Sequence, residues 1–475
     1  MPSVATLKAL CADLPACERW SLRYVESSEF VFQVRQGVVQ PPRVRHDSGA
    51  FLSVFDGTGG GYAATCDVSP SGIRTAAEQA LRWAHFLAHR HLACPVAPDS
   101  PIDSGQAREH GSHETVSGKV LVPLLTKLAR DLKCHPRIVD WSAGLHLRFQ
   151  RTVLLSSTGS MLEQRCSDLT PDLYAVASRA SEVQRRSFGH DYARQGGLEQ
   201  LEALAVSAAA PRVAEEALRL VEAPDCPSAS MDLVLLPGQM VLQIHESIGH
   251  PLELDRILGD ERNYAGGSFV TPEMFGRYRY GSALLNVSFD PFRPQQMASY
   301  AYDDDGIRAE RRMLIRAGVL ERALGGAVSQ RRSGIAGVAC ARAERWNRPP
   351  IDRMANLNLE PGTSSLAEII GRVENGVMME TNRSWSIDDR RNKFQFGCEC
   401  GWLIRDGQVR GLVKNPGYRG ISATFWRSLG AVGDNGTLRV MGLGSCGKGE
   451  PNQTMHVGHA APACLFTGVE VFGRA

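Results

Sequence analysis

The chain has 475 residues and a formal net charge of +2, with 43% hydrophobic and 22% charged residues. These values are ordinary for a globular protein of two or three domains, and so weak a charge gives no reason to expect nucleic acid or a membrane surface as a partner. No apolar run reaches the roughly 18 residues that span a bilayer. Residues 1–8 lack the basic start and apolar core of a signal peptide, so we expect a cytoplasmic protein.

The first half of the chain predicts helices together with hairpin-linked strands. We expect helices at 4–17, 70–89, 114–134 and 197–222, a loop at 95–111, and strands at 20–25, 30–35, 51–55, 61–64, 138–149, 152–156, 161–165 and 173–179. This succession predicts an α+β domain over residues 1–222. The Pro-rich segment 223–228 is the predicted boundary.

The second half, residues 229–475, begins with an apolar strand at 231–236 and a helix that starts at Pro237. Beyond residue 255, short apolar segments alternate with Gly, Asn, Asp and Pro. This pattern predicts a mainly antiparallel β domain, barrel-like, that carries the helix. The predicted fold class is therefore α+β.

The helix after Pro237 carries His245, Glu246 and His250. Zinc peptidases place two histidines four residues apart on a helix, with a glutamate between them. Here the spacing is five, and on an ideal helix the two rings then point about 140° apart. Gly249 permits unusual backbone angles and Pro251 disfavours helical geometry at the preceding residue, so we predict a break or bulge that swings His250 back toward His245. The alternative is a buried amphipathic helix with two incidental histidines.

Four segments occur in the order seen in one known family. They are H-E-S-I-G-H at 245–250 followed by L-E-L-D at 252–255, Y-D-D-D-G-I at 302–307 with L-I-R-A-G-V-L at 314–320, R-M-A-N at 353–356 with P-G at 361–362, and G-S-C-G-K at 444–448. Together they resemble the TldD/PmbA family of zinc metallopeptidases, on the TldD side that keeps its metal site. The likeness spans residues 229–475 and is looser in the first half.

The resemblance implies a zinc ion held by His245, His250 and Cys446, with water at the fourth position. Three protein ligands and one open position are typical of a catalytic zinc. Glu246 would draw the proton from that water as it attacks the scissile carbonyl. The implied activity is zinc-dependent hydrolysis of peptide bonds in small or unstructured peptides.

Further residues receive roles from their positions alone. Glu253 and Asp255 are candidate acceptors for the N–H groups of the ligand histidines, or ordinary solvated acids. The resemblance implies, from their places in the family's motifs, that Arg353, Asn356 and Lys448 bind the substrate backbone or stabilise the tetrahedral intermediate; the alternative is that they form structural salt bridges.

The family implies a dimer, in which this chain is the catalytic partner of a metal-free PmbA/TldE-like relative or pairs with itself. Two segments depart from the family pattern: Arg383–Asn392, which is bulkier and more charged, and Gly259–Ser268, a plain loop or a mobile lid. The first departure leaves open a hydrolase for a small amide or a modified peptide. A non-catalytic assembly subunit with a structural zinc is the other alternative.

Two further groups resemble metal or redox sites more weakly. His85 and His89 are four residues apart on a predicted helix, but without an evident acidic or thiol partner they are predicted to be a solvated or packed pair. Cys398 and Cys400 alternate as on a strand, which permits a redox or second metal site. With twelve cysteines scattered along the chain, we expect buried thiols rather than a disulfide framework.

Overall fold

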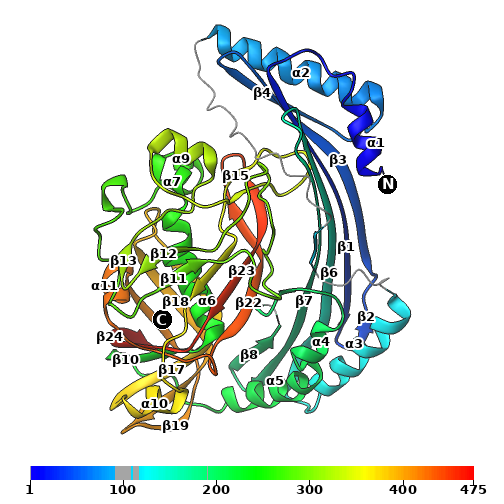
Figure 1. Cartoon of the computed structure of the whole chain (residues 1–475). Helices are drawn as coiled ribbons and strands as arrows, with labels where there is room; N and C mark the ends of the chain where they lie inside the picture. The colour runs from blue at the N-terminus through cyan, green and yellow to red at the C-terminus, as the bar shows by residue number, and fades with distance from the viewer. Residues whose placement is uncertain (1, 91–107, 111–116, 190, 475) are drawn as a thin grey trace.

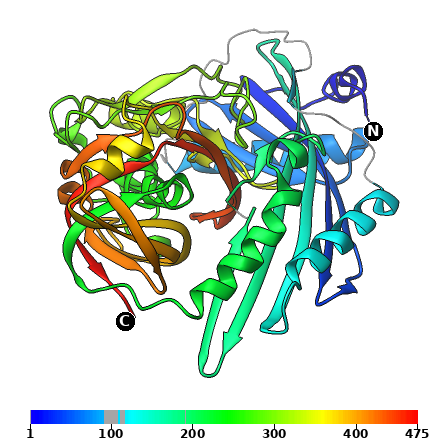
Figure 2. The same ribbon diagram turned by 90° about the horizontal axis from the view of Figure 1, so that it is seen from below.

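The computed structural model describes residues 2–90, 108–110, 117–189 and 191–474. Long curved strands from the first half of the chain form one sheet, and the C-terminal region lies in its hollow (Figures 1 and 2). The predicted loop at 95–111 and the start of the predicted helix at 114 fall mostly outside the described residues. No described helix is long and apolar enough to cross a membrane. The domain limits 1–222 and 229–475 stay predictions.

The curved sheet has the strand order β4-β3-β1-β6-β7-β5, with β2 on β1 and with β8 and β9 on β7. Its strands are β1 (Arg19–Arg35), β2 (Val38–Val39), β3 (Arg43–Asp56), β4 (Gly59–Thr65), β5 (Arg108–His110), β6 (Ile138–Ser156), β7 (Met161–Arg179), β8 (Glu182–Phe188) and β9 (Arg194–Gln195). The predicted hairpin between β3 and β4 is confirmed by the pairing of Asp56 with Gly59.

Four of these strands, β1, β3, β6 and β7, are much longer than predicted. The hydrophobic alternation of β1 breaks at residues 26–29, yet the strand continues because both of its neighbours pair with it there. Ser27 and Glu29 line a polar cavity of about 270 Å³ between the sheet and the C-terminal region. The face of the sheet that turns toward this cavity is therefore polar. The hydrophobic alternation stops at these residues although the strand itself continues.

Helices cover the opposite face of the sheet. On β6, Leu145 and Leu147 join the core under these helices, whereas His146 and Arg148 line the polar cavity. The helices of this half are α1 (Val4–Leu10), α2 (Pro70–His89), α3 (Gly118–Leu132), α4 (Gln200–Ala203) and α5 (Val206–Leu220). The single helix predicted at 197–222 is wrong, because Ala205 adopts a left-handed conformation with φ +50° and separates α4 from α5.

The C-terminal region contains a closed barrel of β10 (Ala229–Leu235), β17 (Asn375–Ile387), β18 (Lys393–Arg405), β20 (Gly417–Ile421) and β24 (Cys464–Phe472). It closes because β10 pairs with both β17 and β24, and the β10–β17 pairing is parallel while the others are antiparallel. Also in this part are β19 (Gln408–Val413), β21 (Leu429–Val432), α10 (Leu366–Gly371) and α11 (Ser422–Arg427). The predicted α+β class with a barrel-like second half is confirmed.

A second sheet lies beside the barrel in the order β13-β12-β11-β16-β23-β22. Its strands are β11 (Val287–Phe289), β12 (Arg312–Arg316), β13 (Val319–Leu320), β16 (Asn356–Leu359), β22 (Arg439–Lys448) and β23 (Gln453–Ala461). The remaining elements are β14 (Ala341–Arg342), β15 (Ile351–Asp352), α7 (Leu254–Leu258), α8 (Arg262–Ala265), α9 (Ala327–Ser333) and the 3₁₀ turn η3 (Pro272–Met274).

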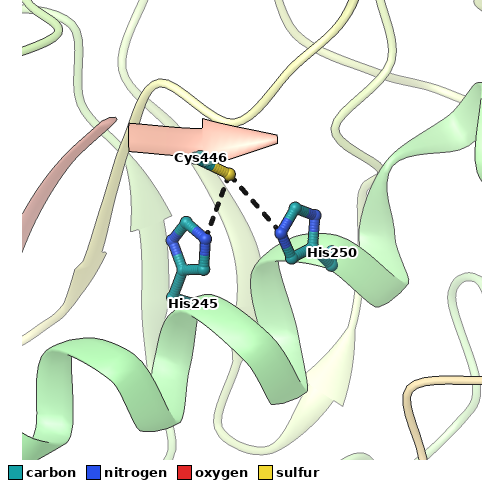
Figure 3. A group of neighbouring side chains, drawn as sticks. All are labelled: His245, His250 and Cys446. Carbon is teal, nitrogen blue, oxygen red and sulfur yellow. Dashed lines mark hydrogen bonds between the residues drawn. The ribbon is translucent and has the colours of Figure 1, made fainter. Parts of the chain in front are cut away.

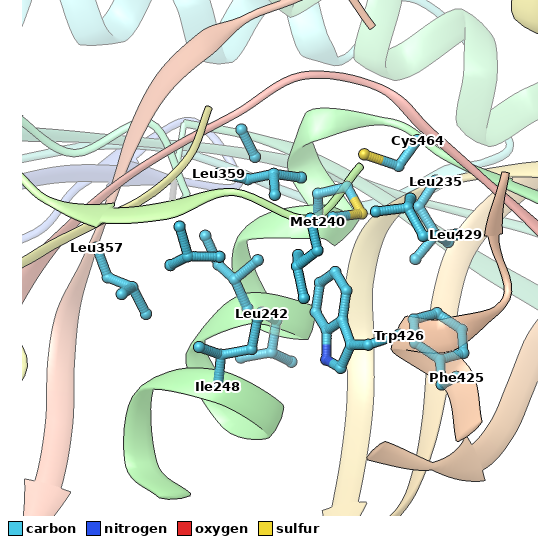
Figure 4. Close-up of a cluster of buried hydrophobic side chains, with 14 of the residues drawn as sticks. Leu235, Met240, Leu242, Ile248, Leu357, Leu359, Phe425, Trp426, Leu429 and Cys464 are labelled. Atoms are coloured by element: carbon cyan, nitrogen blue, oxygen red, sulfur yellow. The ribbon is translucent and has the colours of Figure 1, made fainter. Parts of the chain in front are cut away.

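The helix α6 (Pro237–Ile244) runs through the middle of this region, and its residues from Gly238 to Ile244 are all buried. Met240 and Leu242 belong to one core with Leu357 from β16 and Trp426 from α11 (Figure 4). A helix that is buried on every side is held by packing rather than by its own propensity. The position of the C-terminal end of α6 is therefore fixed by the surrounding core.

Candidate metal centre

Three side chains with metal-ligand atoms meet where α6 ends (Figure 3). His245 and His250 come from the end of the helix and Cys446 from β22. The Sγ atom of Cys446 lies 3.1 Å from Nε2 of His245 and 3.5 Å from Nε2 of His250. All three residues are buried, and their donor atoms lie within 4.8 Å of one another. The residues predicted as ligands are thus together in space.

The five-residue spacing is accommodated by a π-helical turn, η1 (His245–Gly249), followed by a 3₁₀ turn, η2 (His250–Leu252). The backbone N–H of His250 donates to the carbonyl of His245, five residues back, which is the hydrogen bond that defines a π-helix. Residues five apart then share one face. A Cβ atom on Gly249 would lie 2.0 Å from Sδ of Met354, so only glycine fits the turn without a shift. The predicted bulge is confirmed.

The π-turn is fastened by polar contacts to Ser247. The indole nitrogen of Trp426 donates to Ser247 Oγ at 2.9 Å, and the phenol of Tyr280 donates to the Ser247 carbonyl. Irregular backbone leaves polar groups without helical partners, and Tyr280 satisfies one of these, the buried Ser247 carbonyl, while Trp426 holds the Ser247 side chain. The turn is consequently a defined feature of the core.

A third histidine sets the protonation of His245. Nδ1 of His459 lies 2.9 Å from the Leu357 carbonyl, which can only accept, so this nitrogen carries the proton. Nε2 of His459 is then free to accept from Nδ1 of His245 at 2.9 Å. This leaves Nε2 of His245 without a proton on the side of Cys446. Burial lowers the pKa of His245 to about 4 and the pKa of His459 well below its usual value, in keeping with neutral rings.

Glu253 fixes the protonation of the His250 ring in the same way. Its Oε2 atom lies 2.8 Å from His250 Nδ1, and its Oε1 atom accepts from the backbone N–H of Met354 at 3.2 Å. The carboxylate fixes the proton on Nδ1 and turns the unprotonated Nε2 toward Cys446. Glu253 thus occupies the position that the sequence prediction gave it, as an acceptor for a candidate ligand.

Cys446 lies where a thiolate is favoured. Burial raises the pKa of its thiol, but opposing effects, of which the guanidinium of Arg353 is the largest, hold this pKa below the usual value. Arg353 also donates from Nη2 to the Cys446 carbonyl at 2.6 Å. A thiolate rather than a thiol is the form that ligates metals.

Asp255 contacts neither histidine. Its Oδ1 atom accepts from Nζ of Lys448 at 2.5 Å, and Lys448 also donates to the Asp352 carbonyl. Nζ of Lys448 lies 3.8 Å from Glu253 as well. Burial raises the pKa of Asp255 to about 7 even with Lys448 beside it. These groups form a closed ion-pair network behind His250.

The three residues predicted to bind substrate are all fully enclosed: Arg353, Asn356 and Lys448 are each 0% exposed. The amide of Asn356 donates to the Asp290 carbonyl at 3.0 Å and to Ser299 Oγ at 2.9 Å. Arg353 and Lys448 lie near buried carboxylates, which matches the salt-bridge alternative more closely, whereas Asn356 forms only hydrogen bonds within the protein. A contact with substrate stays an untested prediction.

Glu246 directly follows His245 in the chain, and its carboxylate forms an ion pair with Arg391. Nη1 of Arg391, in the connection between β17 and β18, is 3.4 Å from Glu246 Oε2. Sequence reasoning named neither Arg391 nor His459 as a site residue. The only signal for Arg391 was that it lies in the charged segment that departs from the family pattern. His459 lies on the strand paired with that of Cys446, but no motif marks it.

The weaker candidate groups lack such surroundings. His85 is exposed, and its Nε2 lies 2.8 Å from Asp56 Oδ2. Cys398 and Cys400 are buried, and burial raises the pKa of both thiols, which favours the unreactive protonated form. Within the described ranges, His245, His250 and Cys446 are the residues that form a compact group of three potential ligands.

The donor set fits a metal ion. Bonds of about 2.0–2.3 Å at a tetrahedral angle place nitrogen and sulfur donors roughly 3.5 Å apart. The sulfur of Cys446 lies 3.1 and 3.5 Å from the two imidazole nitrogens, and all three donor atoms lie within 4.8 Å of one another. Each imidazole presents an unprotonated nitrogen, and each has its other nitrogen anchored.

Comparisons with known proteins identify the family of the chain. Residues 228–473 match the family model described as the PmbA/TldA metallopeptidase C-terminal domain, and residues 20–84 match that of metallopeptidase domain 1. A protein of Methanothermobacter thermautotrophicus named metalloprotease is 31% identical over 323 residues, which cover 68% of this chain and 67% of the relative. A metalloprotease TldD homolog of Haemophilus influenzae is 22% identical over 95% of this chain and 94% of its own length.

Among solved structures, TldE from Thermococcus kodakarensis superposes with a TM-score of 0.74 at 15% identity and covers 99% of both chains. At that identity the likeness shows the fold alone. The family match across more than half of the chain and the 31% identical relative together establish that this chain belongs to the PmbA/TldD metallopeptidase family.

Proposed function

We propose that this chain is a zinc-dependent peptidase that hydrolyses peptide bonds in small or unstructured peptides. The observation that carries the proposal is the convergence of the Nε2 atoms of His245 and His250 with the sulfur of Cys446, at the end of the helix that carries Glu246. Membership in a metallopeptidase family supports the same reaction class.

The donor types favour zinc. Imidazole nitrogen and thiolate sulfur suit a borderline-soft ion that prefers tetrahedral coordination, and three protein donors leave one position for a substrate. When bound, zinc supplies Lewis acidity to the scissile carbonyl and to water. His245, His250 and Cys446 would hold it, with His459 and Glu253 orienting the two imidazoles.

Glu246 is the proposed proton carrier. Its Oε2 atom takes a proton from the attacking water and passes it to the amide nitrogen that leaves. An amide anion is a very poor leaving group, so delivery of this proton is as necessary as the attack. The thiolate donor weakens the Lewis acidity of the site compared with a third neutral ligand, and this makes the carboxylate more important.

An extended substrate has an available strand edge. Cys446 lies on β22, the last strand of the second sheet. Within the described residues, the outer edge of β22 is bridged to Tyr192 at Gly442, while Ser445 and Gly447 farther along are exposed. A peptide that adds to this edge would bind through its main chain with little sequence preference. Folded proteins, whose strands are already paired, would be poor substrates.

We further propose that the chain acts in a dimer, either with a metal-free relative of the same fold or with itself. The likeness to TldE supports only the shared fold. Size measurement of the chain alone, and after mixing with such a relative, separates the two arrangements.

The first test is metal content. We expect about one zinc per chain in the wild type, and sharply weakened binding in Cys446→Ala because one of three donors is lost. Cys464→Ala is the matched control, since Cys464 is also buried but lies in the barrel. A well-folded wild type without zinc would contradict the proposal.

The second test is the reaction. Glu246→Gln keeps the size of the side chain and removes the base, so it should abolish cleavage of an unstructured peptide while zinc stays bound. Peptide cleavage that survives this change would exclude the mechanism. Turnover only of capped dipeptides by the wild type would indicate a small-amide hydrolase instead.

A further inference from the structure

The connection between β17 and β18 contains Arg391, whose guanidinium lies at the edge of the proposed active site. We propose that Arg391 is a specificity residue that selects peptides with a carboxylate near the scissile bond, either the terminal carboxylate or an Asp or Glu side chain. This inference rests on the proposed peptidase function and adds the class of substrate. Its starting point is the contact of 3.4 Å between Arg391 Nη1 and Glu246 Oε2.

The backbone at Arg391 is held in an unusual shape. Arg391 has φ +61°, a left-handed conformation that is uncommon for residues other than glycine. Its N–H donates to the Asp388 carbonyl at 2.8 Å, and its own carbonyl accepts from Ser422 Oγ at 3.1 Å. The Asp388 carboxylate accepts from the backbone N–H groups of Asn392 and Lys393, so it is committed to the turn itself. The guanidinium is therefore presented from a fixed base.

A second segment braces this connection against the end of the metal helix. Gly267 N–H donates to the Asp389 carbonyl at 3.0 Å, and Phe269 N–H donates to the Arg390 carbonyl at 2.8 Å. Between them, Ser268 Oγ donates to the Pro251 carbonyl at 2.8 Å, directly after His250. The two segments that depart from the family pattern thus lie against each other and form one wall beside the proposed ligands.

Other cations close to the proposed ligands are already engaged. Lys448 is 2.5 Å from Asp255, Arg256 is 2.6 Å from Glu261, and Arg353 donates to the Cys446 carbonyl. All three are almost or completely enclosed. Arg391 keeps 17% of its side chain exposed, and its one ion pair in the described residues is the contact with Glu246.

Arg391 also retains unused donors. Its Nε atom is buried and has no hydrogen-bond partner among the described residues. Arg256 and Arg353 also have such donors, so it is the 17% exposure of its side chain that distinguishes Arg391. A guanidinium offers five N–H donors in a planar fork that matches a carboxylate in two parallel hydrogen bonds. A substrate carboxylate would satisfy the buried Nε and draw the guanidinium away from Glu246.

The test compares wild type, Arg391→Met and Arg391→Lys on matched peptides of one sequence. One peptide ends in a free carboxylate and one in an amide, and a second pair carries Asp or Asn beside the cleaved bond. Arg390→Met is the control variant, because Arg390 is the exposed neighbour in the same turn. Zinc content and thermal unfolding establish that each variant is folded and loaded.

We expect Arg391→Met to lower kcat/KM for the matching acidic peptide by about tenfold or more, mainly through KM, with little change for its neutral partner. Arg391→Lys should recover only part of the loss, because an ammonium lacks the planar fork. Calorimetric titration with the peptide acid released by cleavage should show the same loss of affinity without any turnover. The pair of peptides that responds identifies whether the terminal or the side-chain carboxylate is recognised.

Equal losses for the acidic and neutral peptides would overturn the inference and give Arg391 a role in positioning Glu246. No loss for either peptide would overturn it as well. In both cases wild-type cleavage persists, so the peptidase proposal stands. Absence of cleavage of every peptide by the zinc-loaded wild type would instead count against the peptidase function.

Discussion

Two pairs of histidines on helices of this chain differ in an instructive way. His85 and His89 on α2 have the four-residue spacing that places two rings on one helical face, whereas His245 and His250 are five residues apart. The regularly spaced pair is exposed, and His85 points to Asp56. The irregularly spaced pair is buried and converges with a thiol.

The difference shows that spacing alone does not make a metal centre. Each ring of the buried pair has its far nitrogen fixed, by His459 in one case and by Glu253 in the other. The turn between the rings is fixed by Trp426 and Tyr280. Orientation of this kind is what a pair of ligands needs, because an unanchored imidazole must lose rotamer freedom before it can bind.

The largest effect is expected from breaking the ion-pair network that supports the buried pair. Lys448→Met leaves Asp255 without its buried cation, whereas Glu253 keeps Arg256 and Arg353 nearby. Removal of one partner of a buried ion pair destabilises a protein by about 3–5 kcal/mol. We expect a large fall in the midpoint of denaturant unfolding, together with weaker zinc binding. Lys127→Met removes an exposed ion pair on α3 and should change neither. If Lys448→Met were as stable as the wild type, the ion-pair network would not be what supports the buried histidines.

Gly249→Ala attacks the π-turn directly. The added Cβ would lie 2.0 Å from Met354 Sδ, so Met354 or the turn must move. Overpacking of this kind destabilises by about 1–3 kcal/mol. Because the turn sets the direction of His250, zinc affinity should fall as well. Gly371→Ala at the end of α10 meets no atom within 4 Å and is the control. Unchanged zinc affinity would mean that the turn is not what brings the rings together.

His459→Phe removes the acceptor of the His245 ring while keeping an aromatic ring of similar bulk. Loss of such an orienting partner typically weakens metal binding by about 10–100-fold. Competition with a chelator of known affinity measures the change. His456→Phe is the matched control on the same strand, since His456 lies near Asp168 rather than near the proposed ligands. Equal affinities in the two variants would remove His459 from the site.

The sequence was informative where the cause is local. Gly249 and Pro251 correctly predicted a bulge before His250, but not its cause, because Gly249 and His250 both keep right-handed helical angles. What Gly249 provides is room for Met354. The hairpin after Asp56 and the helix α2 follow from turn chemistry and periodicity. The family resemblance added Cys446, which local pattern alone could not attach to a helix about 200 residues earlier.

The sequence was silent where the cause is distant. His459 lies 214 positions from His245, and Arg391 lies 145 positions from Glu246, so neither contact leaves a local pattern. The long strand β1 was predicted as two because its polar residues Ser27 and Glu29 face another part of the same chain. The sequence alone does not distinguish a polar residue that faces a cavity within a strand from a polar residue at which a strand ends.

The smallest effect is expected from the exposed pair. Replacement of both His85 and His89 by alanine should leave zinc content and peptide cleavage unchanged.

His85 lowers the pKa of the Asp56 carboxyl. The contact therefore favours the folded state above the usual pKa of an aspartate, and this benefit disappears as the pH falls through the depressed pKa. Since both side chains are in contact with water, solvent screening makes the benefit small. We expect the acid unfolding curves of the wild type and the double variant to coincide, or nearly so, down to about pH 4. A loss of zinc in the double variant would show that the regular spacing on α2 does bind metal, and the lesson drawn from the two pairs would then be wrong.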